Sequence, residues 1–290
     1  LVALEGFWAV GTIAVAITAW VAGGTAEAWR WIFATTALPA LIGLGLRLWV
    51  PESPLHLLRT GRAEEARAVV ERIARTNGRA PLPGPLAAPA RQGAVPFRAL
   101  FGGDLRRRSL LALSVWLLVS AAYYGVFVWL PSRLAAEGHG FVRGHGFLVL
   151  VALAQLPGYA LAAFGVERWG RRPTLIGFLL LSAAGCLLFA VAGGPALVAA
   201  STLLMSFALL GTWGALYAFT PELYPTALRA TGMGTAGAMA RLGGLLAPSA
   251  IGVIVAISFG AAVGFFALLL LLAALATRMI DVETRNAPLT

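Results

Sequence analysis

The stretch TPELYPTALRATG, residues 220–232, separates two long apolar runs with two prolines, a glutamate and an arginine. Proline ends or kinks a helix, and charged side chains gather where a membrane helix leaves the hydrocarbon. The stretch therefore predicts a turn at a membrane surface. In this interpretation Pro221 and Pro225 end one helix, and Thr231 and Gly232 open the next.

Composition extends this interpretation to the whole chain. Of the 290 residues 59% are hydrophobic and 12% are charged, whereas a soluble globular protein carries about 25% charged residues. Eight apolar runs reach the length of about 20 residues that a transmembrane helix needs. The sequence thus predicts an all-α integral membrane protein with eight transmembrane helices. The predicted spans are 2–21, 29–50, 109–130, 146–166, 173–192, 195–219, 231–256 and 259–280.

The distribution of arginine predicts the orientation. All 22 basic residues are arginine, and they give a net charge of +10. If the polar segment 51–108 is cytoplasmic, 19 arginines lie on that side and three, Arg30, Arg133 and Arg143, on the other. Because positive loops stay inside, both ends of the chain are expected in the cytoplasm and the protein in the plasma membrane. Topology and attraction to anionic lipids account for the charge, so no nucleic-acid partner is expected.

The residue inventory argues against a metal site, a cofactor or an enzyme. Cys186 is the only cysteine, so no disulfide can form within the chain, and His56, His139 and His145 lack metal-ligand spacing. The apolar runs hold no cluster of carboxylates, histidines or cysteines that could perform catalysis. The chain begins without Met and is already apolar, which favours a fragment whose beginning is missing.

Three short segments resemble motifs of one transporter family. VERWGRRP, residues 166–173, resembles the D/E-R-x-G-R-R loop of the major facilitator superfamily. PESPLHLL, residues 51–58, and PELYPTALRATGMG, residues 221–234, resemble the signatures that follow the sixth and tenth helices of sugar-porter-like members. With YYGVFVWLPS and RLGGLLAP, the chain looks most like the niacin-permease and synaptic-vesicle-glycoprotein-like branch. One departure is Leu55, where the signature usually has arginine.

The resemblance implies a division of the chain. Facilitators have twelve helices in two six-helix bundles, and this chain matches the fifth to the twelfth, without the first four. Residues 1–50 would hold the last two helices of the N-terminal bundle, and residues 51–108 a cytoplasmic linker with short amphipathic helices. Residues 109–290 would form the six-helix C-terminal bundle.

By the same resemblance, the charged motifs would act as gates that lock one state of the transporter. A simpler interpretation is that they only tie helix ends together. The candidate gating residues are Glu52, Glu167, Arg168, Gly170, Arg171, Arg172, Glu222 and Arg229.

Ionisable residues inside membrane spans are costly and are functional candidates by default. Arg241 lies ten residues into the predicted span 231–256, about 15 Å along a helix that begins at Thr231. It could clamp an anion, pair with Glu222 or extend to the surface. Glu5 is placed near the cytoplasmic surface. The resemblance puts aromatic residues at cavity positions too, so the candidate substrate-binding residues are Arg241, Tyr217, Tyr124 and Trp213.

These features predict a monomeric secondary transporter that works by alternating access and is driven by a proton gradient. An arginine among aromatic side chains suits a small, flat organic anion such as nicotinate. A transporter of sugars or other metabolites is an alternative. A truncated membrane protein that does not transport is another.

Overall fold

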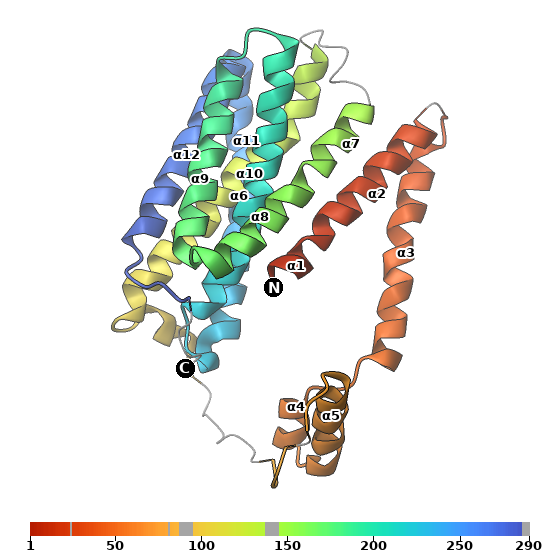
Figure 1. Cartoon of the computed structure of the whole chain (residues 1–290). Coiled ribbons are helices and arrows are strands. Elements are labelled where there is room, and N and C mark those ends of the chain that lie inside the picture. Colours follow the sequence, from red (N-terminus) through yellow and green to blue (C-terminus); the bar gives the residue numbers. More distant parts are fainter. Residues whose placement is uncertain (24, 81, 87–94, 137–144, 286–290) are drawn as a thin grey trace. The chain divides into compact units, whose positions relative to one another are not determined.

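The computed structural model describes residues 1–290 except 24, 81, 87–94, 137–144 and 286–290. The described residues form helices and connecting segments, with no strand among them (Figure 1). The chain divides into a larger unit, Leu1–Trp31 with Pro96–Thr290, and a smaller unit, Ile32–Val95. The predicted division at residues 50 and 108 stays a prediction.

The elements are long helices with short connections. In chain order they are α1 (Val2–Glu5), α2 (Phe7–Ala22), α3 (Ala28–Trp49), α4 (Pro54–Arg59), α5 (Ala63–Thr76), the 3-10 helix η1 (Phe97–Phe101), α6 (Leu105–Ala136), α7 (His145–Leu153), α8 (Gln155–Arg168), α9 (Arg171–Ala190), α10 (Pro195–Glu222), α11 (Thr226–Ile257) and α12 (Phe259–Met279).

Within the described residues, six helical stretches are long and apolar enough to cross a membrane. They are Val2–Ala22, Leu105–Val128, Gly146–Arg168, Arg171–Ala190, Pro195–Glu222 and Gly260–Met279. The two other predicted spans coincide with α3 and α11, which are helices of 22 and 32 residues. The all-α membrane fold is confirmed, whereas the number of eight spans stays a prediction.

Two predicted spans are each made of two helices. The first is α1 followed by α2, with Gly6 between them. The fourth is α7 followed by α8, with the boundary at Ala154. Pro157 explains the second boundary, because its ring collides with the carbonyl group four residues earlier, that of Leu153. The apolar run is therefore continuous in sequence but interrupted in its hydrogen bonding.

The turn predicted at residues 220–232 is present but shorter than expected. Helix α10 runs through Pro221 to Glu222, and α11 begins at Thr226, so Leu223–Pro225 alone form the connection. The prediction that Thr231 and Gly232 open the next helix is wrong by five residues. Proline is tolerated at the start of a helix, because the backbone N–H groups of the first turn have no partner within the helix. Pro225 can therefore directly precede α11, which leaves a short connection. Arg241 then lies about 22 Å along its helix rather than 15 Å.

The larger unit is a bundle with one continuous buried core. Helix α9 packs against α10 and α12, and α6 packs against α11 and α12. Helix α8 covers α10, and α1 contacts both of these helices (Figure 1). The core is almost entirely aliphatic and aromatic, with Trp116, Phe219 and Phe266 among the largest fully buried side chains.

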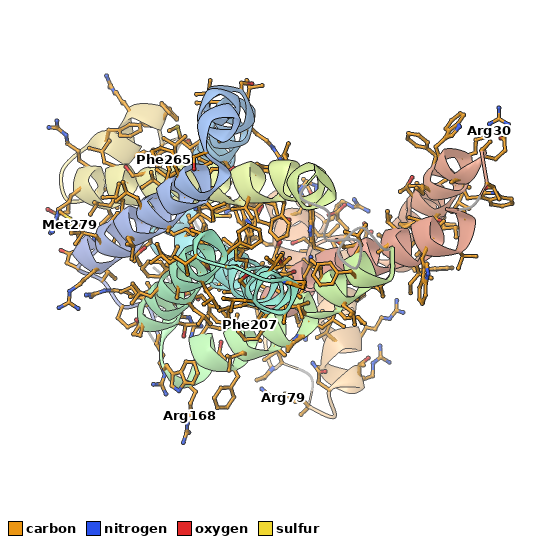
Figure 2. All side chains as sticks on the ribbon, turned by 90° about the horizontal axis from the view of Figure 1, so that it is seen from above. Arg30, Arg79, Arg168, Phe207, Phe265 and Met279 are labelled. Atoms are coloured by element: carbon orange, nitrogen blue, oxygen red, sulfur yellow. The ribbon has the colours of Figure 1, made fainter. Side chains whose placement is uncertain are left out.

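Small residues and buried hydroxyl groups join these helices. A methyl group on Gly158 of α8 would lie 2.2 Å from the backbone oxygen of Phe207 in α10, so only glycine permits this approach. Phe207 lies inside the bundle, where its ring contacts that of Phe178 in α9 (Figure 2). The Arg168 side chain points away from the bundle. The Ser206 hydroxyl donates to the Val151 carbonyl at 2.7 Å. Close contacts through small residues and interhelical hydrogen bonds are typical of membrane bundles.

The smaller unit contains an amphipathic helix pair. Pro54 is the first residue of α4, a position that suits its missing N–H. Leu57 of α4 and Ala66 of α5 are buried where the two helices pack. Arg62 donates two hydrogen bonds to Glu65, at 2.7 and 2.6 Å, at the start of α5. Two short helices therefore lie in the segment 51–108, and its assignment as a cytoplasmic linker stays a prediction.

Candidate functional site

The four predicted substrate-binding residues line one cavity of the larger unit. Tyr124 comes from α6, Trp213 and Tyr217 from α10, and Arg241 from α11. The cavity has a volume of about 100 Å³. Its other lining residues are Glu5, Trp8, Trp116, Tyr123, Tyr159, Leu210, Gly237 and Ala240.

Aromatic rings form one wall of the cavity. The rings of Trp116 and Tyr217 meet edge to face with centroids 4.9 Å apart, and Trp116 and Trp213 do so at 5.6 Å. The Trp116 indole N–H donates to the Thr220 hydroxyl at 2.9 Å, which fixes the orientation of this buried ring. Edge-to-face contacts are a favoured arrangement of aromatic pairs, so they stabilise the orientation of the rings in this wall.

A glycine pair determines where Tyr124 lies. A methyl group on Gly243 would approach the Leu117 carbonyl oxygen to 2.6 Å, so α11 and α6 nearly touch there. A methyl group on Gly244 would lie 2.7 Å from the ring of Tyr124. The glycines therefore leave the space that Tyr124 occupies, and Tyr123 stacks edge to face against it at 5.2 Å.

Two opposite charges reach this cavity from different helices. Arg241 is exposed and Glu5 of α1 is half-buried, and neither forms an ion pair with another described residue. Arg241 is not paired with Glu222, which was one of the alternatives. Glu222 instead binds Arg171. The cavity thus presents one guanidinium and one carboxylate beside a wall of rings.

Sequence reasoning missed part of this cavity. Glu5 was expected near the surface, but it lines the cavity together with Arg241. Trp116 and Tyr159 were not singled out either. Each of these residues is an aromatic or ionisable side chain inside an apolar run, and this could have drawn attention to it. The sequence pattern does not indicate, however, which face of a helix lines the cavity.

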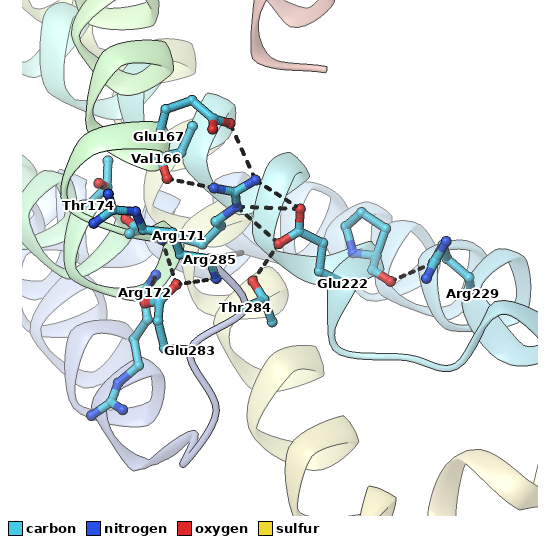
Figure 3. A network of polar contacts seen from close by, with 12 residues as sticks. Val166, Glu167, Arg171, Arg172, Thr174, Glu222, Arg229, Glu283, Thr284 and Arg285 are labelled. Carbon is cyan, nitrogen blue, oxygen red and sulfur yellow. Dashed lines mark hydrogen bonds and ion pairs between the residues drawn. The ribbon is translucent and has the colours of Figure 1, made fainter. Parts of the chain in front are cut away.

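A second group of polar side chains lies where α8, α9 and α10 end or begin, and we call Glu167, Arg171, Glu222, Glu283 and Thr284 the charge cluster. Figure 3 shows the Arg171 guanidinium between the carboxylates of Glu167 and Glu222. Its Nε lies 3.0 Å from a Glu222 oxygen, and an Nη lies 3.3 Å from Glu167. The Arg171 side chain is 14% exposed and that of Glu222 is 22% exposed, so the pair is shielded from water.

The segment after α12 completes the charge cluster. Glu283 accepts hydrogen bonds from the backbone N–H groups of Arg171 and Arg172, at 2.9 and 3.1 Å, at the start of α9. The Thr284 hydroxyl donates to Glu222. A carboxylate at a helix N-terminus accepts hydrogen bonds from backbone N–H groups that have no partner within the helix. Its negative charge also interacts favourably with the positive end of the helix dipole. Glu283 and Thr284 were not predicted, because the sequence does not indicate which helices the segment after α12 contacts.

Gly170 permits this arrangement. Its φ angle is +110°, a conformation that L-residues rarely adopt, and a methyl group there would lie 2.9 Å from the Glu283 carboxylate. The connection between α8 and α9 is therefore only two residues long, Trp169–Gly170.

The remaining predicted gating residues make other contacts. Arg229 donates to the Pro221 carbonyl at 2.9 Å, and Arg172 to the Arg278 carbonyl at 3.2 Å. Arg168 is exposed. Glu52 belongs to the smaller unit and accepts a hydrogen bond from the adjacent Ser53 amide.

Several known proteins are similar to this chain in sequence. The family model described as Sugar (and other) transporter matches residues 2–290. The niacin transporter NiaP of Acinetobacter baylyi is 38% identical over 249 residues, which are 86% of this chain and 56% of that protein. The synaptic vesicle 2-related protein of Xenopus laevis is 31% identical, over 98% of this chain and 55% of its own length.

A solved structure has the same fold. It is that of the proton:xylose symporter XylE, of the major facilitator superfamily, bound to 6-bromo-6-deoxy-D-glucose. It matches with a TM-score of 0.67 at 22% sequence identity, over 91% of this chain and 58% of that one. The chain thus spans little more than half the length of these proteins. The chain belongs to the sugar (and other) transporter family of the major facilitator superfamily, whose members are transporters and not enzymes.

Proposed function

We propose that the complete protein is a secondary transporter of small organic anions with a flat ring, of the nicotinate type. The observation that carries this proposal is the convergence of Arg241, Tyr124, Trp213 and Tyr217 on one cavity. A guanidinium can hold a carboxylate through two parallel hydrogen bonds, and aromatic rings stack on a flat ring. The niacin transporter that is 38% identical supports the same class of substrate.

Proton coupling is part of the proposal, with Glu5 as the proton-binding group. When Glu5 and Arg241 are both charged the cavity is neutral, and an entering anion leaves an uncompensated negative charge. That excess negative charge disfavours binding of the anion. Protonation of Glu5 removes this excess charge, so a proton and an anion favour each other's binding. The other titratable groups that line the cavity are Tyr123, Tyr124, Tyr159, Tyr217 and Arg241.

The same proposal places the protein as a monomer in the plasma membrane, with both ends of this chain and the charge cluster on the cytoplasmic side. Facilitators hold substrate between their two bundles, and one bundle rocks against the other. The charge cluster joins α8, α9, α10 and the segment after α12 within one bundle, and in this proposal it fixes the helix ends against which the other bundle closes in one of the alternating states.

Uptake by the full-length protein in proteoliposomes tests the proposal. We expect saturable uptake of radiolabelled nicotinate that an inward proton gradient accelerates. Benzoate should compete, because it presents a carboxylate on a flat ring, whereas nicotinamide, with the same ring but no charge, should compete far less. Equal competition by nicotinamide would exclude the anion clamp, and competition by xylose or glucose instead would favour the sugar alternative.

Glu222→Gln should separate a gating role from a structural one. The change keeps a hydrogen-bonding side chain but removes the charge opposite Arg171. If the charge cluster acts as a lock, the ratio of the locked to the unlocked state should fall by about tenfold. Labelling of a cavity cysteine, Gly237→Cys, by a membrane-impermeant reagent reports the population. A methyl group at Gly237 meets nothing within 4 Å, and the native Cys186 is buried and silent.

The control for this experiment is Glu71→Gln, which removes the partner of Arg67 in α5. It should leave the labelling rate unchanged. If Glu222→Gln lowers the unfolding temperature but leaves labelling from both sides of the membrane as in the parent protein, the cluster only ties helix ends together.

A further inference from the structure

Outside the substrate cavity, the larger unit has a groove with a basic rim and an apolar floor. It lies where α6 begins and α12 ends, and these two helices pack against each other. The groove has a volume of about 390 Å³ and is lined by Gly103, Arg106, Arg107, Leu110, Leu111 and Met279. No contact in the charge cluster involves these six residues.

The position of the groove along the helices suits the level of lipid headgroups. The stretches able to span a membrane are Leu105–Val128 in α6 and Gly260–Met279 in α12. Arg106 and Arg107 therefore lie at the first turn of one span, and Met279 at the last residue of the other. A phospholipid changes from charged phosphate to hydrocarbon at this same depth.

The charges on the rim are only partly neutralised. Arg107 and Arg108 share one carboxylate, that of Asp281, at 3.9 and 3.5 Å. The guanidinium of Arg106 is exposed and has no ion pair or hydrogen bond with any other described residue. Exposed ion pairs at these distances contribute little, so the rim keeps an excess of positive charge that an anion could bind.

The floor of the groove is apolar and open. Leu110 is 48% exposed and Met279 is 46% exposed. Met279 is the last residue of α12 (Figure 2). Leu275, one turn before Met279, is 55% exposed. An acyl chain can lie along these side chains while a phosphate stays at the arginines, whereas a free phosphate ion would use only the rim.

We propose that this groove is a binding site for an anionic phospholipid. Arg106 and Arg107 hold the phosphate, because guanidinium groups form paired hydrogen bonds with phosphate oxygens. Leu110, Leu111 and Met279 hold the first part of an acyl chain. Basic pockets between membrane helices on the cytoplasmic side favour such headgroups, and each arginine near the surface strengthens binding by about fivefold.

Native mass spectrometry of the purified full-length protein tests this site, with phosphatidylglycerol as the probe and phosphatidylcholine of equal chain length for comparison. In Arg106→Gln/Arg107→Gln, we expect the affinity for phosphatidylglycerol to fall by tenfold or more while phosphatidylcholine binding is unchanged. Arg75→Gln/Arg79→Gln removes the same charge from exposed positions of the smaller unit and should lower the affinity less than twofold. Both pairs are exposed, so folding should not be affected.

Two further outcomes decide between a site and a general attraction. If the control pair lowers phosphatidylglycerol binding as much as the rim pair, the arginines act only through the net charge and the site is excluded. Leu110→Gln should weaken phosphatidylglycerol binding by several-fold, because it disturbs the apolar floor. An unchanged affinity in Leu110→Gln, or full displacement of the lipid by millimolar inorganic phosphate, would also exclude a lipid site.

Discussion

Arg241→Gln is expected to lower kcat/KM for nicotinate uptake by about 100-fold, because two charge-assisted hydrogen bonds to a carboxylate together contribute roughly 3 kcal/mol. Glutamine can still donate a hydrogen bond, but it supplies no charge opposite the carboxylate. Arg241→Lys should recover part of the activity, since it restores the charge without the planar fork. Initial rates of uptake over a range of nicotinate concentrations measure both effects.

Folding is not expected to explain the loss in Arg241→Gln. The side chain is exposed and makes no ion pair with another described residue, so the unfolding temperature should stay close to that of the parent protein. Arg75→Gln, in α5 of the smaller unit, is the matched control and should transport normally. Arg241→Gln with the uptake of the parent protein would contradict the role of Arg241 as the anion ligand.

Glu5→Gln is expected to abolish proton-driven accumulation of nicotinate while exchange of nicotinate across the membrane continues. Glutamine is a neutral stand-in for protonated Glu5, so Arg241 stays free for the anion at every pH. The parent protein should bind nicotinate more tightly as the pH falls, because protonation of Glu5 favours the anion. The variant should lose this dependence, and accumulation under a proton gradient should drop by tenfold or more.

Two measurements keep this prediction separate from the transport proposal. Exchange of labelled for unlabelled nicotinate needs a working anion site but no proton, so its absence in the parent protein would contradict the proposed substrate. Normal proton-driven accumulation in Glu5→Gln, together with normal exchange, would contradict only the role of Glu5. Glu64→Gln in the first turn of α5 is the control and should behave as the parent protein does.

Most elements of the fold could be predicted because membrane spans are local features. A run of about 20 apolar residues must become a helix in a membrane, since no water satisfies its backbone there. The first residues of α4 and the turn at Gly170 also depend on local sequence, since proline and glycine have strong backbone preferences. The predicted start of α11 was wrong because a proline can either end a helix or directly precede one. Pro225 was expected to end the preceding helix, but it directly precedes α11.

Some of the residues that line the cavity stood out in the sequence for the same reason. Arg241, Tyr217 and Tyr124 stand out as polar or aromatic residues in apolar runs, and the family resemblance supplied the face of each helix. Glu5 stood out too, but its partners on α6, α8, α10 and α11 are distant in sequence. Nothing local indicates that the first turn of the chain meets those helices.

By itself, the sequence determined the membrane class, the helices and the family, because hydropathy and short motifs are written along the chain. Only the tertiary structure decided which side chains meet. It brought Glu5 to the cavity of Arg241, paired Arg171 with Glu222, and placed Glu283 over the first N–H groups of α9. The physical reason is that packing depends on close approach between helices. Gly158 and Gly243 control that approach, and their partners lie on other helices, dozens of residues away or more.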